Sequence, residues 1–529
     1  MNAQSNGAPA SLPDYVPVIV IGAGPTGMTA ATLLAQEGIS CLLLDRHESV
    51  YPLPRAVHAD DEIYRILTRV GVGDEFAAHR RAGLGLRLLD TDMRVLTELK
   101  RSPQPSANGY PQMNMFDQPE LEGMLRANLK RYPQLTFRGN VEVTSVTQNT
   151  PGRVRVSFLD RVRGGEQHVE ASYVLGCDGA NSLVRAAIGS HMYGLPFQQT
   201  WAVIDVDTDA ELDQWEGCHQ LCSTERAGTY MRVGQTRYRW EFRLKDGETA
   251  ADYQKITDIE PLIKPWLGDT PAEQLRLVRV TAYTFRAQVA SSWRDRNVFI
   301  LGDAAHLTPP FVGQGMASGL RDALNLSWKL VGVLGNSLPE SVLDTYEQER
   351  KPHTAAMILM AVSVGAAMTG GGRLGDLIRH VVFPRMGNLR LPGTRTSAAD
   401  GVAPGLRKSA MVVKARTPGQ LAGTLCPNPV LHDGVRFDQV VGNRFALVTS
   451  AALSAAQERQ LRSRGAVVVS VAPASELGRW LKQGRATAAI VRPDAAVMEA
   501  GRNVQALCDA LPSFSAGEAA RAESESVSR

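Results

Sequence analysis

The chain has 529 residues, 44% of them apolar and 21% charged, and this length predicts two or three domains rather than one core. Its formal charge of +3 arises from 57 basic and 54 acidic residues spread along the sequence, so no nucleic-acid partner is expected. No apolar stretch reaches the roughly 18 residues of a membrane span, and the first residues carry no secretory signal. We therefore expect a cytoplasmic protein without a membrane span.

Six cysteines are present, and no two of them form a C-x-x-C pair. This pattern does not indicate a disulfide framework and fits a reducing compartment. The segment from Cys218 to Cys222 also contains His219, but no second pair of ligands accompanies it. We therefore expect ordinary thiols and no metal site.

The N-terminal segment predicts a β-α-β unit, with apolar runs at residues 18–21 and 41–44 and a helical pattern between them. The first strand leads into a glycine fingerprint, Gly22-Ala23-Gly24-Pro25-Thr26-Gly27. Its first glycine permits a tight turn, its second lets a pyrophosphate approach the backbone, and its third lets the helix pack on the strand. Asp45 ends the second strand, where a carboxylate can accept hydrogen bonds from ribose hydroxyls.

Two later segments are expected to return to the same sheet, because apolar runs at residues 173–176 and 298–301 are typical of buried parallel strands. The first run leads into Asp178 of an Asp-Gly pair, a pattern that is also common in simple turns. The second leads into a glycine-rich motif at residues 302–316. There the Asp303 carboxylate can bind ribityl hydroxyls, and the glycines leave room for a flat ring near a helix N-terminus.

Between these segments the pattern changes to strict alternation, which predicts an inserted antiparallel sheet. In residues 229–244 the aromatic side chains fall on one face of an expected hairpin, and Arg and Glu side chains fall on the other. The aromatic face has two interpretations, a wall of a substrate site or plain core packing. The candidate substrate residues are Tyr230, Arg232, Tyr238 and Trp240.

The C-terminal third begins with two expected helices, one from residue 313 to about residue 334 and one from about residue 341. Alternating β and α elements follow residue 434 and predict a small α/β domain. The tail from residue 516 is rich in Ser, Glu and Arg and is expected to be disordered.

The three motifs, in this order, resemble the class A flavoprotein aromatic hydroxylases, whose fold is typified by para-hydroxybenzoate hydroxylase. The chain is most similar to the 3-(3-hydroxyphenyl)propionate hydroxylase branch, through residues 54–58, 118–119, 313–316, 318–323 and 325–330. The resemblance implies an α/β fold with a Rossmann-like FAD-binding domain, an inserted mixed or antiparallel β-sheet substrate domain and a thioredoxin-like C-terminal domain. The expected boundaries are 1–186 and 286–400 for the FAD-binding domain, 187–285 with a contribution from 80–115 for the substrate domain, 401–515 for the C-terminal domain, and 516–529 for the tail.

The resemblance also implies the cofactor site. Arg55 matches an arginine that contacts the FAD diphosphate. Gln118 matches a glutamine that contacts FAD, and Asp303 matches the residue that binds the ribityl chain. Asp178 matches a residue tied to FAD and pyridine-nucleotide binding, whereas Asp45 departs from the family pattern, in which glutamate is commoner. The full expected set is Gly22, Gly24, Pro25, Thr26, Gly27, Asp45, Arg46, Arg55, Gln118, Asp178, Gly302, Asp303, Pro310, Gly313, Gln314, Gly315 and Met316.

Three further residues are implied near the chemistry. Pro309 and Pro310 match positions where the family's backbone borders the isoalloxazine ring and the substrate. His306 invites a catalytic role and is also explained as a structural histidine. The thioredoxin-like domain lacks a C-x-x-C pair, so a packing or assembly role is expected for it.

The implied activity is that of an FAD-dependent monooxygenase. NADH or NADPH, which the sequence does not distinguish, would reduce FAD, and O₂ would form a flavin C4a-hydroperoxide that hydroxylates a phenolic small molecule, a 3-hydroxyphenylpropionate-like compound being one option. The alternatives are a halogenase or oxidase of the same fold and a non-catalytic flavin-binding sensor or assembly protein. The halogenase signature Trp-x-Trp-x-Ile-Pro is absent. A homodimer is compatible with the sequence.

Overall fold

The first sheet joins segments that are far apart in the chain. The computed structural model describes residues 12–51, 56–370, 404–414, 421–431 and 434–514. Along this sheet the strands are ordered β17 (Arg294–Asp295), β18 (Val298–Ile300), β11 (Glu166–Gly176), β1 (Tyr15–Ile21), β2 (Cys41–Leu44) and β8 (Leu135–Arg138). The five strands from β18 to β8 run parallel. Two more, β9 (Val141–Thr150) and β10 (Arg153–Asp160), extend antiparallel from β11.

The carboxyl ends of the parallel strands gather the predicted motifs at one edge. Val18 pairs with both Cys41 and Tyr173, and Val174 pairs with Val298, so the four predicted strands are neighbours in space. These strands are apolar on both faces because helices cover the sheet. The glycine fingerprint, Asp45, Asp178 and Asp303 each follow one of these strands, as ligand-binding residues do in open α/β sheets.

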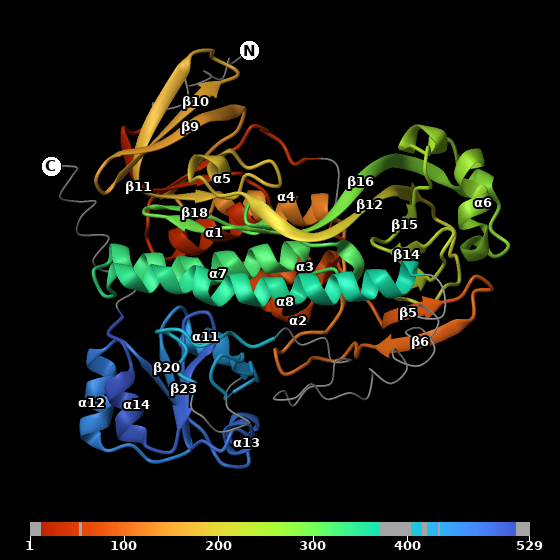
Figure 1. Cartoon of the computed structure of the whole chain (residues 1–529). Coiled ribbons are helices and arrows are strands. Elements are labelled where there is room, and N and C mark those ends of the chain that lie inside the picture. Colours follow the sequence, from red (N-terminus) through yellow and green to blue (C-terminus); the bar gives the residue numbers. More distant parts are fainter. Residues whose placement is uncertain (1–11, 52–55, 371–403, 415–420, 432–433, 515–529) are drawn as a thin grey trace, which may run out of the picture.

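A second sheet extends from the first and is antiparallel apart from one pair, β13 and β5. Its strands are ordered β19 (His306–Leu307), β16 (Arg276–Ala290), β12 (Met192–Asp207), β15 (Arg237–Arg243), β14 (Gly228–Arg232), β13 (Cys218–Leu221), β5 (Gly85–Leu89) and β6 (Val95–Lys100). The long strands β12 and β16 connect it to the part that holds the first sheet (Figure 1). One face of this sheet packs its aromatic side chains against α6 (Ile256–Leu267).

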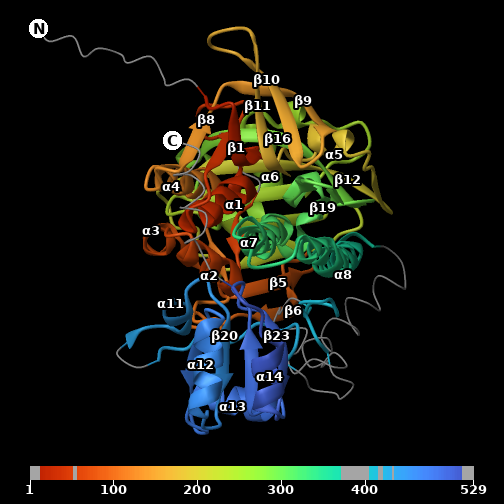
Figure 2. The ribbon, with the colours of Figure 1, turned by 90° about the vertical axis from the view of Figure 1, so that its left-hand side faces the viewer.

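Helices cover the first sheet and separate it from the C-terminal part (Figures 1 and 2). The two long helices α7 (Gly315–Leu334) and α8 (Asp344–Thr369) pack on each other, and α7 also packs on α1 (Pro25–Gln36). The other helices of this part are α2 (Asp61–Arg69), α3 (Gly73–His79), α4 (Gln118–Leu129) and α5 (Leu183–Ala187), with single 3₁₀ turns at Ala250–Tyr253, Ala272–Gln274, Gly302–Ala304, Pro310–Val312 and Glu340–Leu343. A small sheet of β3 (His58–Ala59), β7 (Asn114–Met115) and β4 (Arg81–Ala82) lies nearby.

The C-terminal part has the strand order of a thioredoxin-like fold. Its sheet runs β21 (Val467–Ser470), β20 (Ala446–Thr449), β22 (Ala488–Val491) and β23 (Val497–Gly501), with β20 parallel to β21 and antiparallel to β22. Its helices are α11 (Phe437–Val441), α12 (Ala455–Ser463), α13 (Glu476–Gln483) and α14 (Val504–Ala510). The domain boundaries given above stay predictions, and the expected tail at 516–529 lies outside the described residues.

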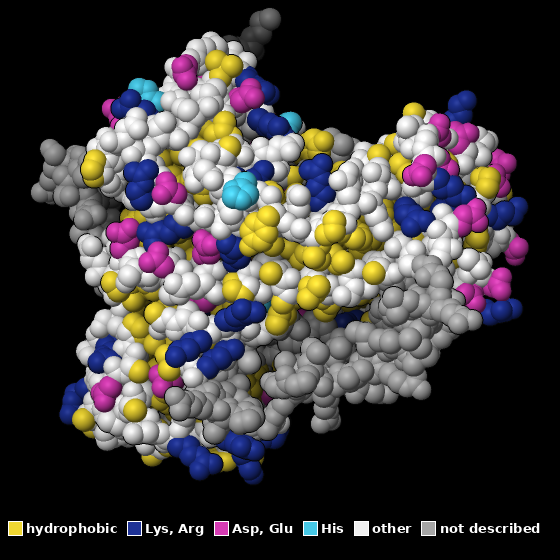
Figure 3. Space-filling model, viewed as in Figure 1, with side chains coloured by type: hydrophobic (Ala, Val, Ile, Leu, Met, Phe, Trp, Pro, Cys, Tyr) yellow, Lys and Arg dark blue, Asp and Glu magenta, His cyan; other side chains and the backbone are white. Residues whose placement is uncertain are grey.

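One face of the molecule carries exposed hydrophobic side chains. They gather across the middle of the view in Figure 3, where α8 runs in Figure 1. On this helix Leu359 and Met360 are 59% and 39% exposed. Within the described ranges, no helix combines the length and the apolar character that crossing a membrane requires.

Candidate active site

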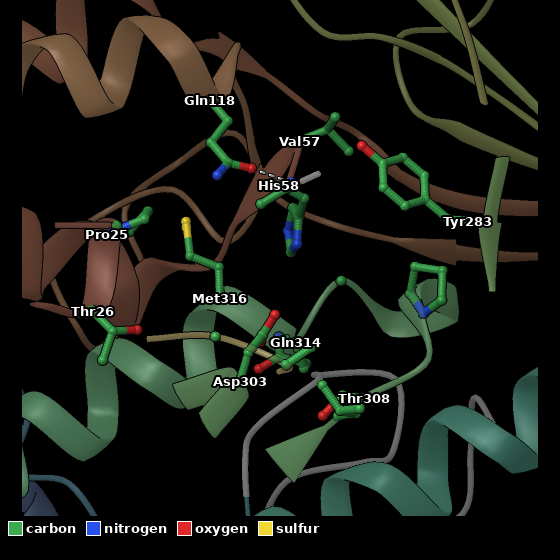
Figure 4. A pocket seen from close by; sticks show the side chains of 18 of the residues that line it. Pro25, Thr26, Val57, His58, Gln118, Tyr283, Asp303, Thr308, Gln314 and Met316 are labelled. Carbon is green, nitrogen blue, oxygen red and sulfur yellow. Dashed lines mark hydrogen bonds between the residues drawn. The ribbon is translucent and has the colours of Figure 1, made fainter. Parts of the chain in front are cut away.

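A cavity of about 960 Å³ extends from the carboxyl edge of the first sheet to the second sheet. Figure 4 shows Pro25, Thr26, Gln118, Asp303 and Met316 around one hollow, although they come from four separate segments. The predicted residues that line it are Gly22, Gly24, Pro25, Thr26, Asp45, Arg46, Gln118, Asp178, Asp303, Pro310, Gly313, Gln314, Gly315 and Met316. The predicted residues that do not line it are Gly27, Gly302, His306, Pro309, Tyr230, Arg232, Tyr238 and Trp240. Arg55 lies outside the described residues.

Of the three glycines in the fingerprint, one has open space beside its Cα atom and two are closely packed. A Cβ on Gly22, whose φ is +104°, would lie 2.3 Å from the carbonyl oxygen of Cys177, and a Cβ on Gly27 would lie 1.9 Å from that of Gly22. These two glycines therefore allow close backbone packing. A Cβ on Gly24 would meet no described atom within 4 Å. Gly24 precedes α1, which has no side-chain cap and no acidic residue in its first turn, so its free N–H groups fit a phosphate.

The Asp45 carboxylate holds the fingerprint against the end of β2. Its Oδ2 accepts a hydrogen bond from the Ala23 N–H at 2.6 Å, and its Oδ1 accepts one from the His47 N–H at 2.7 Å. Each carboxylate oxygen has a second lone pair, and Asp45 lines the cavity. The carboxylate can therefore fix the loop and still accept a ribose hydroxyl.

Two glycines bring α1, α7 and the turn before Asp303 together around the Thr26 side chain. A Cβ on Gly302, at φ +59°, would lie 2.8 Å from Thr26 Oγ1, and a Cβ on Gly319 would lie 2.2 Å from the same atom. Gly302 and Gly319 thus act through packing, while Asp303 points toward the cavity (Figure 4).

Asp178 shapes the turn after β11 and also reaches the cavity. Its carboxylate accepts hydrogen bonds from Ser182 Oγ and from the Val184 N–H. Burial raises the pKa of Asp178, and these hydrogen bonds offset that effect only in part. A hydroxyl or N–H donor from a ligand would relieve the cost of the buried charge.

His58 is a cavity residue that the sequence argument did not single out. Gln118 Oε1 accepts a hydrogen bond from the Ala56 N–H at 2.6 Å and so positions the segment that carries His58. A Cβ on Gly313, at φ +64°, would lie 2.9 Å from His58 Nδ1. Burial lowers the pKa of His58 to about 4, although Asp60 favours its charged form. A neutral imidazole therefore faces the cavity at neutral pH.

A buried ion network fixes the start of α7 beside His58. Arg321 donates to Asp60 Oδ2 and to Glu62 Oε2, both at 2.7 Å, and to Gln314 Oε1 at 2.7 Å. Gln314 also donates to Asp60 Oδ2 at 3.1 Å. The α7 N-terminus, which carries no side-chain cap, is therefore held at the cavity, where its partial positive charge favours an anionic group.

His306 lies behind the cavity rather than in it. It is fully buried, and its Nε2 is 2.7 Å from Asp322 Oδ2. Asp322 Oδ2 also accepts from the Gly302 N–H at 3.1 Å, and Asp322 Oδ1 accepts from Arg350 Nε at 2.8 Å. These contacts fit the structural interpretation, in which His306 positions the turn that carries Asp303.

The aromatic face of the second sheet packs in a core. Tyr230, Tyr238 and Trp240 are at most 2% exposed and lie in one hydrophobic cluster with Trp266 of α6. Arg232 pairs with Glu211 at 2.6 Å and does not line the cavity. The opposite face lines the cavity, with Leu86, Val203, Cys218, Gln220, Thr229, Met231, Arg239 and Glu241. Since side chains alternate along a strand, core packing of the aromatic residues turns the polar ones toward the cavity.

The fold and the cavity define a dinucleotide-binding α/β protein in which a second sheet closes the far end of the site. A family model described as "FAD binding domain" matches residues 15–361. Since this match spans more than half of the chain, the chain belongs to that family, and FAD is its cofactor.

Several aromatic hydroxylases with curated names are similar in sequence. The chain is 35% identical over 67% of its length to a probable NADH-specific resorcinol 4-hydroxylase of Rhodococcus jostii, covering 66% of that protein. It is 32% identical over 82% of its length to a 3-(3-hydroxy-phenyl)propionate/3-hydroxycinnamic acid hydroxylase of Burkholderia vietnamiensis, covering 78% of that protein. The alignments thus span about two thirds to four fifths of these relatives.

Solved structures share the fold at lower identity. The flavin-dependent monooxygenase PieE, in complex with FAD and substrate, matches with a TM-score of 0.78 and 20% identity, over 94% of this chain and 98% of PieE. Aklavinone-11 hydroxylase, with FAD and aklavinone, matches with a TM-score of 0.77 and 23% identity, over 94% of this chain and 99% of that protein. The α/β fold with three parts is therefore confirmed.

The low pKa of His58 gives a testable dependence of stability on pH. The folded-state pKa of about 4 lies below the ordinary value of 6.5, so between these values the unfolded state binds more protons and stability falls as pH falls. For His58→Gln this contribution disappears. We expect the stability advantage of the wild type over the variant to shrink by about 2 kcal/mol from about pH 7 to about pH 5. Urea unfolding of both proteins at the two pH values measures this difference, and an unchanged difference would contradict it.

Proposed function

We propose that the protein is an FAD-dependent monooxygenase that hydroxylates a phenolic small molecule with NADH or NADPH and O₂. The observation that carries this proposal is one continuous cavity. One end is the fingerprint edge of the first sheet, and the other end is the buried face of a separate sheet. This arrangement fits a cofactor and a small substrate in contact within a site that excludes water.

The residues that would hold the different parts of FAD follow one another along the cavity. We assign the phosphates to the backbone of Gly24 and the first turn of α1, the ribose to Asp45, and the ribityl chain to Asp303. Gln118, Gly313, Gly315 and Met316 would border the ring system. Bound FAD supplies electron transfer from the nicotinamide and activation of O₂. The chain contributes a neutral His58, the N-terminus of α7 and a largely apolar enclosure.

The names of the relatives support the class of reaction. The Rhodococcus relative is described as an NADH-specific hydroxylase of resorcinol and the Burkholderia relative as a hydroxylase of 3-(3-hydroxy-phenyl)propionate. Both descriptions name a phenolic ring, so a phenol is the proposed substrate class here. The choice between NADH and NADPH is left to experiment.

The test is anaerobic mixing of the purified yellow protein with NADH or NADPH and a panel of phenols. A substrate should accelerate bleaching of the flavin at least roughly tenfold and should gain one hydroxyl group when air is admitted. If no phenol accelerates bleaching and none is hydroxylated, the protein is not this kind of hydroxylase. That outcome would favour the alternative of a non-catalytic flavin-binding protein.

Asp303→Ala gives a test of the cofactor assignment. Loss of the carboxylate at the proposed ribityl position should leave a protein that loses FAD or holds it weakly. The measurement is the ratio of flavin to protein absorbance after gel filtration, compared with that of the wild type. A variant with full flavin absorbance would count against the role of Asp303.

Two further expectations stay predictions. A homodimer is testable by light scattering coupled to size exclusion, and the cytoplasmic location by fractionation of the source cells. For the C-terminal domain we propose a packing role. Directly after β20, where a redox-active thioredoxin carries its C-x-x-C pair, the chain reads Ser450-Ala451-Ala452-Leu453 and supplies no thiol.

A further inference from the structure

Three polar side chains form a row across the cavity-facing side of the second sheet. Gln220 on β13 pairs with Thr229 on β14, which pairs with Glu241 on β15. All three line the cavity, and they are only 3%, 5% and 8% exposed. Directly opposed residues on neighbouring strands place their Cβ atoms about 5 Å apart on the same face. The row, which we call the polar strip, is therefore one continuous feature of the cavity wall.

The polar strip has more hydrogen-bond acceptors than donors. Gln220 Nε2 donates to the carbonyl oxygen of Phe311 at 3.0 Å, while Gln220 Oε1 is buried without a partner among the described residues. The Glu241 carboxylate accepts no hydrogen bond from the described part of the chain, and Arg239 Nη1 lies 3.9 Å away. Burial raises the pKa of Glu241, and Arg239 offsets this only in part. Because buried acceptors without donors are costly, the strip fits a ligand that supplies O–H groups.

The charges next to the polar strip do not favour an anion there. Asp205 accepts from Arg239 at 2.7 and 3.0 Å and from a second arginine, on β16, at 2.6 Å. With Glu241, this group has two negative and two positive side chains and no net formal charge. A substrate carboxylate at the strip would therefore face the Glu241 carboxylate. Arg101 and Arg286 also line the cavity, but they are not part of the strip.

We propose that Glu241 and Gln220 bind hydroxyl groups of the substrate, and that the substrate is a neutral aromatic ring with at least two hydroxyls rather than a carboxylated phenol. The two acceptors lie on strands that are two apart in the sheet, roughly 10 Å between backbones. One hydroxyl cannot reach both, whereas hydroxyls on two carbons of one ring can approach both side chains. This inference rests on the proposed hydroxylase function and names the substrate class for the same cavity.

The test measures binding to the FAD-loaded protein by calorimetry, without turnover. The probes are resorcinol, 1,3-dimethoxybenzene, in which both hydroxyl donors are methylated, and 3-hydroxybenzoate, in which one hydroxyl is replaced by a carboxylate. We expect resorcinol to bind at least about tenfold more tightly than either of the others, because a hydrogen bond to a charged acceptor contributes about 1.5 kcal/mol or more. If 3-hydroxybenzoate binds as tightly as resorcinol, the inference is wrong.

Glu241→Gln tests the residue itself while keeping the side-chain shape. Its affinity for resorcinol should fall about tenfold and its affinity for 1,3-dimethoxybenzene should change less than about twofold, because 1,3-dimethoxybenzene has no hydroxyl that donates a charge-assisted hydrogen bond to Glu241. The matched control is Glu225→Gln, since the Glu225 side chain is 80% exposed and does not line the cavity. This control should bind all three probes as the wild type does. An unchanged ratio between the affinities for resorcinol and 1,3-dimethoxybenzene in Glu241→Gln would overturn the role of Glu241.

Product formation separates this inference from the proposed function. If resorcinol binds selectively and no phenol in the panel is hydroxylated, the hydroxylase proposal fails while the recognition of hydroxyls stands. If carboxylated phenols are hydroxylated in preference to dihydroxylated rings, the inference fails while the hydroxylase proposal stands.

Discussion

Replacing Gly24 with valine should give a folded protein that has lost its FAD. A Cβ at this position would meet no described atom within 4 Å, and the backbone at φ −76°, ψ 179° accommodates a β-branched residue. The new side chain would instead occupy the cavity where the phosphates approach the backbone. Such an overlap costs several kcal/mol, which is more than roughly a hundredfold in the dissociation constant of FAD.

Flavin content and the fold of the Gly24→Val protein are measured separately. The ratio of flavin to protein absorbance should fall to that of protein without flavin. The far-UV circular dichroism and the melting temperature of the Gly24→Val apoprotein should match those of the wild-type apoprotein. Gly123→Val is the matched control, because Gly123 on α4 also has open space around it but does not line the cavity. A Gly24→Val protein that purifies with full flavin would contradict the assigned position of the phosphates.

The FAD-binding half could be predicted from the sequence because its constraints are local. The tight approach of Gly22 to Cys177 and of Gly27 to Gly22 needs glycine whatever the rest of the fold does. The apolar runs before Asp178 and Asp303 are short and buried on both faces, so they indicate parallel strands before any tertiary contact is known. The order of these segments then places them at one edge of one sheet.

The substrate side could not be predicted in the same way. Alternation along 229–244 defines two faces of the hairpin, but it does not say which one meets the cofactor. Packing against α6, at residues 256–267, decides this, because Trp266 takes the aromatic face into a core. The segment from Cys218 to Cys222 carried a signal for the cavity-facing side of the second sheet, because its residues alternate between the two faces. Its Gln220 is a cavity residue, whereas His219 lies on the opposite face against Trp266.

His58 depends on contacts that are still more distant in sequence. It meets the cavity because Gly313 leaves room for its ring and because Gln118 holds the segment before it. Gln118 lies about 60 positions and Gly313 about 255 positions away along the chain. The segment 54–58 carries part of the family resemblance, but nothing in its sequence assigns the His58 side chain to the cavity.

A buried ion cluster joins the C-terminal domain to the FAD-binding part. Arg492, which follows β22, donates to both oxygens of Glu349 on α8 at 2.9 and 3.0 Å, and to Asp494. Lys329 on α7 is 3.0 Å from Glu349, and Glu349, Lys329 and Arg492 have fully buried side chains. Burial lowers the pKa of Lys329 to about 8, although the Glu349 charge opposes this. Burial would raise the pKa of Glu349, but Arg492 and Lys329 hold it well below its ordinary value.

Arg492→Met should therefore destabilise the whole protein without emptying the cofactor site. Without Arg492, Asp494 loses its ion-pair partner and Glu349 keeps only Lys329. The cluster then holds one buried negative charge without compensation, which costs about 3–5 kcal/mol. For a chain of 529 residues, whose unfolding entropy is about 1.1 kcal/mol/K, that loss corresponds to a fall in melting temperature of about 3–5 °C. The matched control is Arg459→Met, which removes an exposed arginine from α12 of the same domain and should leave the melting temperature within about 1 °C of the wild type. Limited proteolysis should also cut the Arg492→Met protein faster between the two parts, since the interface opens more often.

FAD content of the Arg492→Met protein should stay near that of the wild type, because none of the cluster residues lines the cavity. If Arg492→Met melts like the control, the cluster is not what holds the C-terminal domain in place, and the packing role proposed for this domain loses its main support.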